Sequence, residues 1–175
     1  PGDDDRRAQL VQLDVHGFVV TLANVHLTHL PHAPDAPDAP DAATPSWRAR
    51  QLQTVCDALE SMGPADLTVI AGDFNEDLSG PGLRGHMTGA AALHDAFALA
   101  GQARSPTFFD DQGRGRVLDH VLLVPSLTRA TVHVTEARTV LHADRPDAHG
   151  TTASDHSGLL VTFGLSRGSA RTAAP

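Results

Sequence analysis

The chain has 175 residues, of which 13 are Lys or Arg and 21 are Asp or Glu, so its formal net charge is −8. This length suits a single domain with a sizeable core. The acidic balance argues against a protein that holds nucleic acid through general positive charge, because such binding relies on clustered Lys and Arg. The single cysteine, Cys56, excludes an internal disulfide and a cysteine-based metal cluster. Any metal site must therefore use oxygen ligands or some of the 11 histidines.

The start of the chain predicts two strands followed by a loop. Residues 8–15 and 18–27 are rich in strand-forming residues, and His16-Gly17 between them suits a two-residue hairpin turn. Residues 28–45 are rich in proline, which removes backbone donors, so this segment is expected to be an exposed loop.

A helix and a buried strand are expected next. The helix covers residues 47–62, with Ser46 or Thr44 positioned to cap its first turn. Residues 66–71 form a short apolar run that is typical of a strand buried on both faces.

The second half of the chain predicts mainly short strands. Residues 80–89 are expected to form a loop and residues 90–99 a helix. Strands are expected over residues 107–109, 116–124, 131–141 and 157–163.

The mixture of helices with parallel and antiparallel strands indicates the α/β class, as a layered α/β sandwich with mixed β-sheets flanked by helices. We expect a disordered lead-in over residues 1–7, one domain over 8–165 and a polar tail over 166–175. No apolar run approaches the ~20 residues of a membrane span. No signal segment is recognised either, so localisation stays open.

Four short clusters place Asp, Asn or His at the end of a predicted strand, where sheet proteins assemble their active sites. The clusters are Asn24-Val25-His26-Leu27, Gly72-Asp73-Phe74-Asn75, Leu118-Asp119-His120 and Ser154-Asp155-His156. Because side chains alternate along a strand, Asn24 and His26 share one face, whereas Asp119 and His120 lie on opposite faces.

The residue types in these clusters suit the hydrolysis of phosphate esters. A buried Asp119 needs a partner, and His156 would be fixed in one tautomer and made more basic by that carboxylate. Asp73 and Asp155 offer oxygen ligands for a hard ion such as Mg²⁺ or Mn²⁺. Asn75 adds an uncharged donor. A metal, a base and amide donors together favour attack of an activated water on phosphorus.

In this order the clusters resemble the endonuclease/exonuclease/phosphatase superfamily, over residues 8 to about 163. The resemblance implies the C-terminal portion of a four-layer phosphoesterase fold. It also implies a metal-dependent phosphodiester or phosphomonoester hydrolase that uses Mg²⁺ or Mn²⁺. The substrate would be a nucleic acid, a phospholipid head group or a small phosphodiester, and the N-terminal half of the same fold would be a further partner.

The resemblance also implies roles for individual residues. Asp73 would orient or deprotonate the attacking water and bind metal. Asn75 would hold water and phosphate, and His26 would contact the scissile phosphate.

In the later clusters, Asp155 would bind the metal or its water. His156, braced by Asp119, would act as base or as a phosphate-stabilising imidazolium. Asn24 would support His26, and His120 stands where the superfamily usually has Tyr.

Two alternatives stay open. The superfamily's principal metal ligand is a Glu on an early strand, and Glu60, Glu76 and Glu136 all lie in other contexts. The chain could therefore be an incomplete, non-catalytic domain. A calcineurin-like metallophosphoesterase is a weaker alternative, suggested by Asp14-Val15-His16 followed by Gly72-Asp73.

Overall fold

Five strands form the central sheet of the computed structural model, which describes residues 6–29, 46–141 and 154–167. Their order is β1 (Gln9–Val15), β2 (Phe18–His26), β3 (Leu67–Asp73), β7 (Asp119–Leu123) and β4 (His94–Asp95). The β2–β3 pair is parallel, because the helix α1 lies between these strands in the chain. The other neighbours are antiparallel, so the sheet is mixed as predicted.

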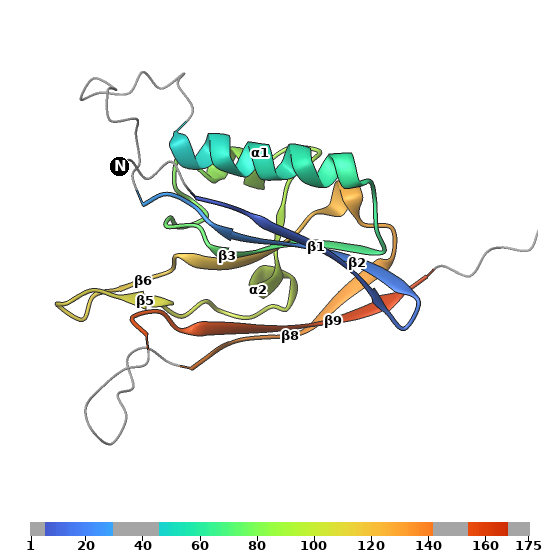
Figure 1. Cartoon of the computed structure of the whole chain (residues 1–175). Helices are drawn as coiled ribbons and strands as arrows, with labels where there is room; N and C mark the ends of the chain where they lie inside the picture. Colours follow the sequence, from blue (N-terminus) through green and yellow to red (C-terminus); the bar gives the residue numbers. More distant parts are fainter. Residues whose placement is uncertain (1–5, 30–45, 142–153, 168–175) are drawn as a thin grey trace, which may run out of the picture.

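The remaining elements lie around this sheet in layers (Figure 1). The helix α1 (Trp47–Met62) covers one face, and a two-stranded sheet of β8 (Thr131–Val140) and β9 (Gly158–Ser166) covers the other. The smaller elements are β5 (Phe108–Phe109), β6 (Gly115–Arg116), α2 (Ala96–Leu99), η2 (Arg84–Met87) and η3 (Pro125–Leu127). This arrangement confirms a layered α/β fold.

Apolar side chains fill both spaces between the layers. The core between the sheet and α1 contains Ala23, Val25, Leu27, Leu52, Val55, Leu59, Ile70, Phe74, Leu83, Leu93, Leu122, Val124 and Leu127. The core on the β8–β9 side contains Leu67, Val69 and Leu123, with further partly buried strand residues around them. The inner strands β2, β3 and β7 therefore direct alternate residues into the two cores, as the pleat of a strand requires.

Local sequence explains where the first elements begin and end. His16 and Gly17 have φ values of 52° and 82°, the left-handed pair that a two-residue hairpin turn needs. Ser46 caps α1 by accepting a hydrogen bond from the backbone N–H of Ala49 at 3.2 Å. Gly63, with a φ of 79°, follows the last turn of the helix.

The helix predicted over residues 90–99 is wrong for most of its length. Only Ala96–Leu99 is helical, because the carboxylate of Asp95 accepts from Phe97 and Ala98 N–H and so starts the helix there. Immediately before it, His94–Asp95 pairs with β7. A side chain that caps a helix cannot also lie inside it.

The strand predicted over residues 116–124 is divided in the structure. Gly115–Arg116 pairs with β5, and Asp119–Leu123 joins the central sheet. Between them the N–H groups of Leu118 and Asp119 both donate to the buried hydroxyl of Thr107, at 3.0 and 3.1 Å. This side-chain acceptor takes the place of a ladder partner, so the ladder is interrupted.

At the chain's end, β9 runs through Ser166, and the next residue, Arg167, donates to the Asp66 carboxylate at 2.9 Å. The lead-in over residues 1–5 and the remaining tail over 168–175 lie outside the described residues, as do most of the predicted loop 28–45 and the segment 142–153. No helix among the described residues has the length and apolar character needed to cross a membrane.

Gly72 allows the central strands to pack closely just before the site. Its φ is +135°, and a Cβ added there would lie 2.0 Å from the carbonyl oxygen of Val25 on β2. Both features require glycine, because other residues rarely adopt this conformation and backbone cannot yield as a flexible side chain does.

We predict that Gly72→Ala destabilises the fold by about 3 kcal/mol or more, from backbone strain together with displacement of β2. Gly89→Ala is the matched control, because Gly89 also has a positive φ (+88°) but nothing lies within 4 Å of its added Cβ. It should cost about 1 kcal/mol. Urea unfolding measures both changes, and equal losses in the two variants would show that the contact with Val25 does not matter.

Candidate active site

Three polar side chains lie side by side across neighbouring strands of the central sheet. His26 on β2 is the register partner of Asp73 on β3, and Asp73 is the register partner of Asp119 on β7. Register partners point to the same face of a sheet, here the face away from α1. The His26 Nε2 atom lies 3.4 Å from Asp73 Oδ2. We call these three residues the row.

His156 joins the row from a different part of the chain. Its Nδ1 atom lies 2.8 Å from Asp119 Oδ2, and its Nε2 atom lies 3.9 Å from Asp73 Oδ2. An ionised carboxylate only accepts, so Nδ1 carries the proton and Nε2 faces Asp73. The Asp–His pair expected from the sequence is therefore present in the geometry.

The position of His156 is fixed by β5. Phe108 forms a backbone bridge with His156, and the two rings are 5.1 Å apart. The N–H of Ser157 donates to the carbonyl of Thr107 at 2.6 Å. His156 is consequently held on both sides of its own backbone, with 27% of its side chain exposed.

Asn75 orients Asp73 and connects it to β2. Its backbone N–H donates to Asp73 Oδ1 at 2.7 Å, and its side-chain Nδ2 donates to Asp73 Oδ2 at 3.3 Å and to the carbonyl of Leu27 at 3.0 Å. This turn needs the left-handed φ of 54° at Asn75, a conformation that asparagine tolerates better than most residues.

Asp119 is a half-buried carboxylate whose pKa is perturbed by its surroundings. Burial raises its pKa above the usual value, and the neighbouring charge of Asp73 raises it further. Hydrogen bonds from Thr107 and His156 act in the opposite direction. Like charges directly opposite each other on a sheet are destabilising, so Asp73 and Asp119 need positive charge nearby.

His120 points to the other face of the sheet and is fully buried. Burial lowers its pKa to about 4, and the nearby Arg104 contributes to the shift. The ring is therefore neutral near pH 7. Because arginine only donates, the contact of 2.7 Å between Arg104 Nη1 and His120 Nδ1 assigns the proton to Nε2, which donates to the Glu76 carbonyl. His120 therefore lies behind the row, on the opposite face of the sheet from Asp119.

Sequence reasoning missed two supporting residues. Thr107 is 1% exposed, and its hydroxyl accepts hydrogen bonds from the N–H groups of Leu118 and of Asp119, the first residue of β7. Arg104 forms an ion pair with Asp95 and donates to the Asp119 carbonyl at 3.3 Å. Neither residue belongs to a charged or histidine-containing motif, so the sequence carried no signal for them.

Two residues expected at the site lie apart from the row. Asp155 is exposed, and its contact with β5 runs through its backbone carbonyl, which accepts from Phe109 N–H at 3.3 Å. Asn24 is also exposed, and across the described ranges no hydrogen bond joins it to His26. The metal role of Asp155 and the supporting role of Asn24 stay predictions.

A candidate metal group is formed by Asp73, Asp119 and His156, whose ligand atoms all lie within 4.8 Å of one another. Two carboxylates and an imidazole are donors that divalent ions accept. Within the described part of the chain this group contains no glutamate.

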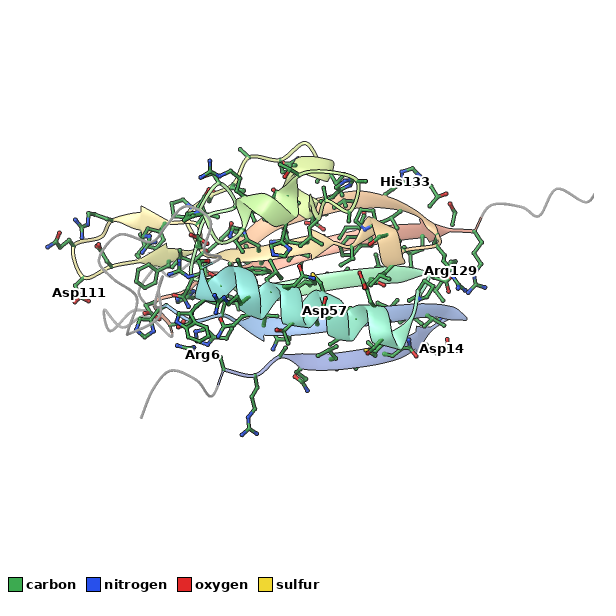
Figure 2. All side chains as sticks on the ribbon, turned by 90° about the horizontal axis from the view of Figure 1, so that it is seen from above. Arg6, Asp14, Asp57, Asp111, Arg129 and His133 are labelled. Atoms are coloured by element: carbon green, nitrogen blue, oxygen red, sulfur yellow. The ribbon has the colours of Figure 1, made fainter. Side chains whose placement is uncertain are left out.

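The calcineurin-like alternative is wrong. Asp14 and His16 lie in the β1–β2 turn, where the Asp14 carboxylate accepts from Gly17 N–H at 2.7 Å. Because β2 and β3 are parallel, the β1–β2 turn lies beside the start of β3, whereas Asp73 lies at the end of β3. Figure 2 shows Asp14 at one end of the molecule and Asp111, in the β5–β6 turn, at the other.

Solved structures share this fold at low sequence identity. Humanized D. rerio TDP2 carrying 14 mutations matches with a TM-score of 0.66 and 19% identity, covering 91% of this chain and 61% of that one. An endonuclease/exonuclease/phosphatase from Bacteroides vulgatus gives 0.64 and 18%, covering 92% and 56%. A 3′ phosphatase, NExo, from Neisseria, bound to a product DNA hairpin, gives 0.55 and 19%, covering 93% and 66%. The chain thus spans about three-fifths of the length of these proteins.

No curated protein sequence matches the chain closely enough to count as a relative. The family model described as the endonuclease/exonuclease/phosphatase family matches residues 2–156, which is most of the chain. The resemblance inferred from the four clusters is confirmed: the chain belongs to the endonuclease/exonuclease/phosphatase family.

Proposed function

We propose that this chain is part of a metal-dependent phosphoester hydrolase, with His26, Asp73, Asp119 and His156 at its active site. The observation that carries the proposal is the convergence of these four side chains from three strands and a distant turn. Family membership supports it, as do similar folds such as the NExo 3′ phosphatase and a mannosyl-6-phosphatase from Bacteroides thetaiotaomicron.

Asp73, Asp119 and His156 suit a divalent ion, because the basic groups that face the two carboxylates among the described residues are histidines, which carry a positive charge only when protonated. We propose Mg²⁺ or Mn²⁺ as that ion, with Asp155 as a further ligand for the ion or its water. The bound ion would neutralise phosphate charge and lower the pKa of a coordinated water.

His156 is proposed as the proton-transfer group. Its Nδ1–H donates to Asp119 Oδ2, with 2.8 Å between the nitrogen and the oxygen. Nε2 is then available to accept a proton from the attacking water or, once protonated, to stabilise phosphoryl oxygens. The carboxylate of Asp119 also stabilises the imidazolium that such a transfer creates.

His26 and Asn75 are proposed to position the phosphate. The His26 side chain is 56% exposed and lies at the edge of the row, so its ring can reach a phosphoryl oxygen in solution. The Asn75 amide already donates to Asp73 and Leu27, so its first effect is to aim the Asp73 carboxylate.

A non-catalytic domain is the second candidate. One observation favours it: the candidate metal group formed by the described residues contains no glutamate. Calorimetric titration with Mg²⁺ separates the two. Tight binding, together with turnover of a phosphate ester in a separate assay, supports the hydrolase, whereas weak or absent binding supports the non-catalytic domain.

We expect His156→Ala to lower kcat by about 10²–10⁴-fold, the contribution typical of a positioned acid or base. Asp73→Ala should lower kcat by a similar factor. The measurement is hydrolysis of bis(p-nitrophenyl) phosphate and p-nitrophenyl phosphate with Mg²⁺. His133→Ala is the control, because His133 is exposed on β8 away from the row (Figure 2). Wild-type kcat in the His156 variant would contradict the proposed role.

A second prediction concerns the repulsion between the carboxylates of Asp73 and Asp119. Without metal, Asp119→Asn should raise the melting temperature by about 3 °C, because removing one of two facing carboxylates increases the free energy of unfolding by about 1 kcal/mol. Because the pKa of Asp119 is raised, its ionisation costs stability as the pH rises above 3.8, so the gap to the wild type should widen over that range.

Thermal melts with and without Mg²⁺ complete this test. The wild type should be stabilised by Mg²⁺, and Asp119→Asn should lose most of that increase. Asp110→Asn is the control, since Asp110 pairs with Arg114 in the β5–β6 turn and takes no part in the row. It should lower the melting temperature and keep the Mg²⁺ effect. An equal Mg²⁺ effect in Asp119→Asn and the wild type would exclude Asp119 from the metal site.

A further inference from the structure

The segment that leads into β1 lies near the end of β2 that carries His26. The β1–β2 ladder begins at the Gln9–Asn24 pair and is antiparallel. Two residues before Gln9 is Arg7, and two residues after Asn24 is His26. The ladder does not extend beyond Gln9, and Arg6 and Arg7 lie in the segment that precedes β1, where both border the same cavity as His26. Arg7 is exposed and Arg6 is partly buried.

Both arginines line a small cavity that also contains His26. The cavity has a volume of about 150 Å³, and Gln51 and Thr54 of α1 form part of its wall. This space accommodates a phosphate group with its first waters. His26 is shared between the cavity and the row, since its Nε2 atom lies 3.4 Å from Asp73 Oδ2. A larger cavity of about 610 Å³, lined by Arg50 and His86 among others, contains no residue of the row.

The chemistry of the cavity suits an anion. Arg6 and Arg7 are the only adjacent basic residues in a sequence with a net charge of −8, and they lie beside the site. Guanidinium groups bind phosphate oxygens through two parallel hydrogen bonds. Both arginines also have contacts within the chain, and each guanidinium has five N–H donors to share among several acceptors.

We propose that this cavity is a subsite for a second phosphate group of the substrate, bound by Arg7 and Arg6 on the β1 side of His26. The inference rests on the proposed function, which places the reacting phosphate on the row. A substrate with two phosphate groups would then span His26, with one phosphate at the acidic end and the other in the cavity. The second phosphate belongs either to the next nucleotide of a nucleic acid or to a small bisphosphate.

Equilibrium binding tests this subsite in buffer in which Ca²⁺ replaces Mg²⁺, so that the row can hold a cation. Recovery of unchanged probe after each titration establishes that binding is measured without turnover. The probes are two pairs that differ by one phosphate: thymidine 5′-monophosphate against the 5′-phosphorylated thymidine dinucleotide, and fructose 6-phosphate against fructose 1,6-bisphosphate. Wild type should prefer the two-phosphate member of at least one pair. Preference for the dinucleotide identifies a nucleic acid, and preference for the bisphosphate identifies a small molecule.

Charge variants then locate the binding. Arg7→Gln should lower the affinity for the two-phosphate probes by about tenfold, as expected for one charge-assisted hydrogen bond. The affinity for the one-phosphate probes should stay within about twofold of the wild-type value. Arg6→Gln should act in the same direction, and Arg7→Lys should restore part of the affinity. Arg129→Gln is the matched control, because Arg129 is exposed at the opposite end of the molecule from Arg6 (Figure 2). Thermal melts establish that each variant is folded.

Three results would overturn the subsite: a wild type with no preference for either two-phosphate probe, an Arg7→Gln variant with unchanged affinities, or an equal loss for one-phosphate and two-phosphate probes. These results are separable from failure of the hydrolase proposal. If the chain binds the two-phosphate probes selectively but cleaves no ester, the subsite proposal is supported and the hydrolase proposal is not. If the chain cleaves bis(p-nitrophenyl) phosphate without that selectivity, only the hydrolase proposal is supported.

Discussion

Two carboxylates that face each other across β3 and β7 are the constraint on which the site depends. Asp73 and Asp119 are register partners, and water is partly excluded from both. The surrounding residues offset this repulsion: Asn75 donates to Asp73, and His156 lies against both carboxylates. The same excess of negative charge makes the position receptive to a cation. The repulsion that destabilises the fold at this position is therefore also what favours binding of the proposed metal ion.

A second polar network holds the row from the opposite face. His120 donates to the carbonyl of Glu76, and the Glu76 carboxylate faces Arg48 at 3.4 Å. Arg48 in turn donates to the carbonyls of Thr28 and His29, directly after β2. This chain of contacts ties the loop after Asn75 to the end of the strand that carries His26. Small movements of either strand end are opposed, which keeps the side chains of the row aligned.

The sequence allowed the local features of the fold to be predicted, but not the contacts between segments. The β1–β2 hairpin and α1 follow from alternation, turn residues and capping, which are local. The helix predicted over residues 90–99 failed because Asp95 caps a helix and pairs with Arg104. The role of Thr107 was not predicted because it also depends on a contact between segments. Its hydroxyl acts on residues 11 and 12 positions away, and a lone threonine on a strand indicates no such contact.

Charge changes sign across this end of the sheet. Arg6 and Arg7 border the cavity that reaches His26, and Asp73 and Asp119 continue from His26 across β3 and β7. A cation is favoured at the acidic end, where His156 also lies, and an anion at the basic end. Under the two proposals above, a phosphate ester would lie across the strands rather than along them. Proton transfer by His156 and binding by Arg7 would then act on opposite ends of the substrate.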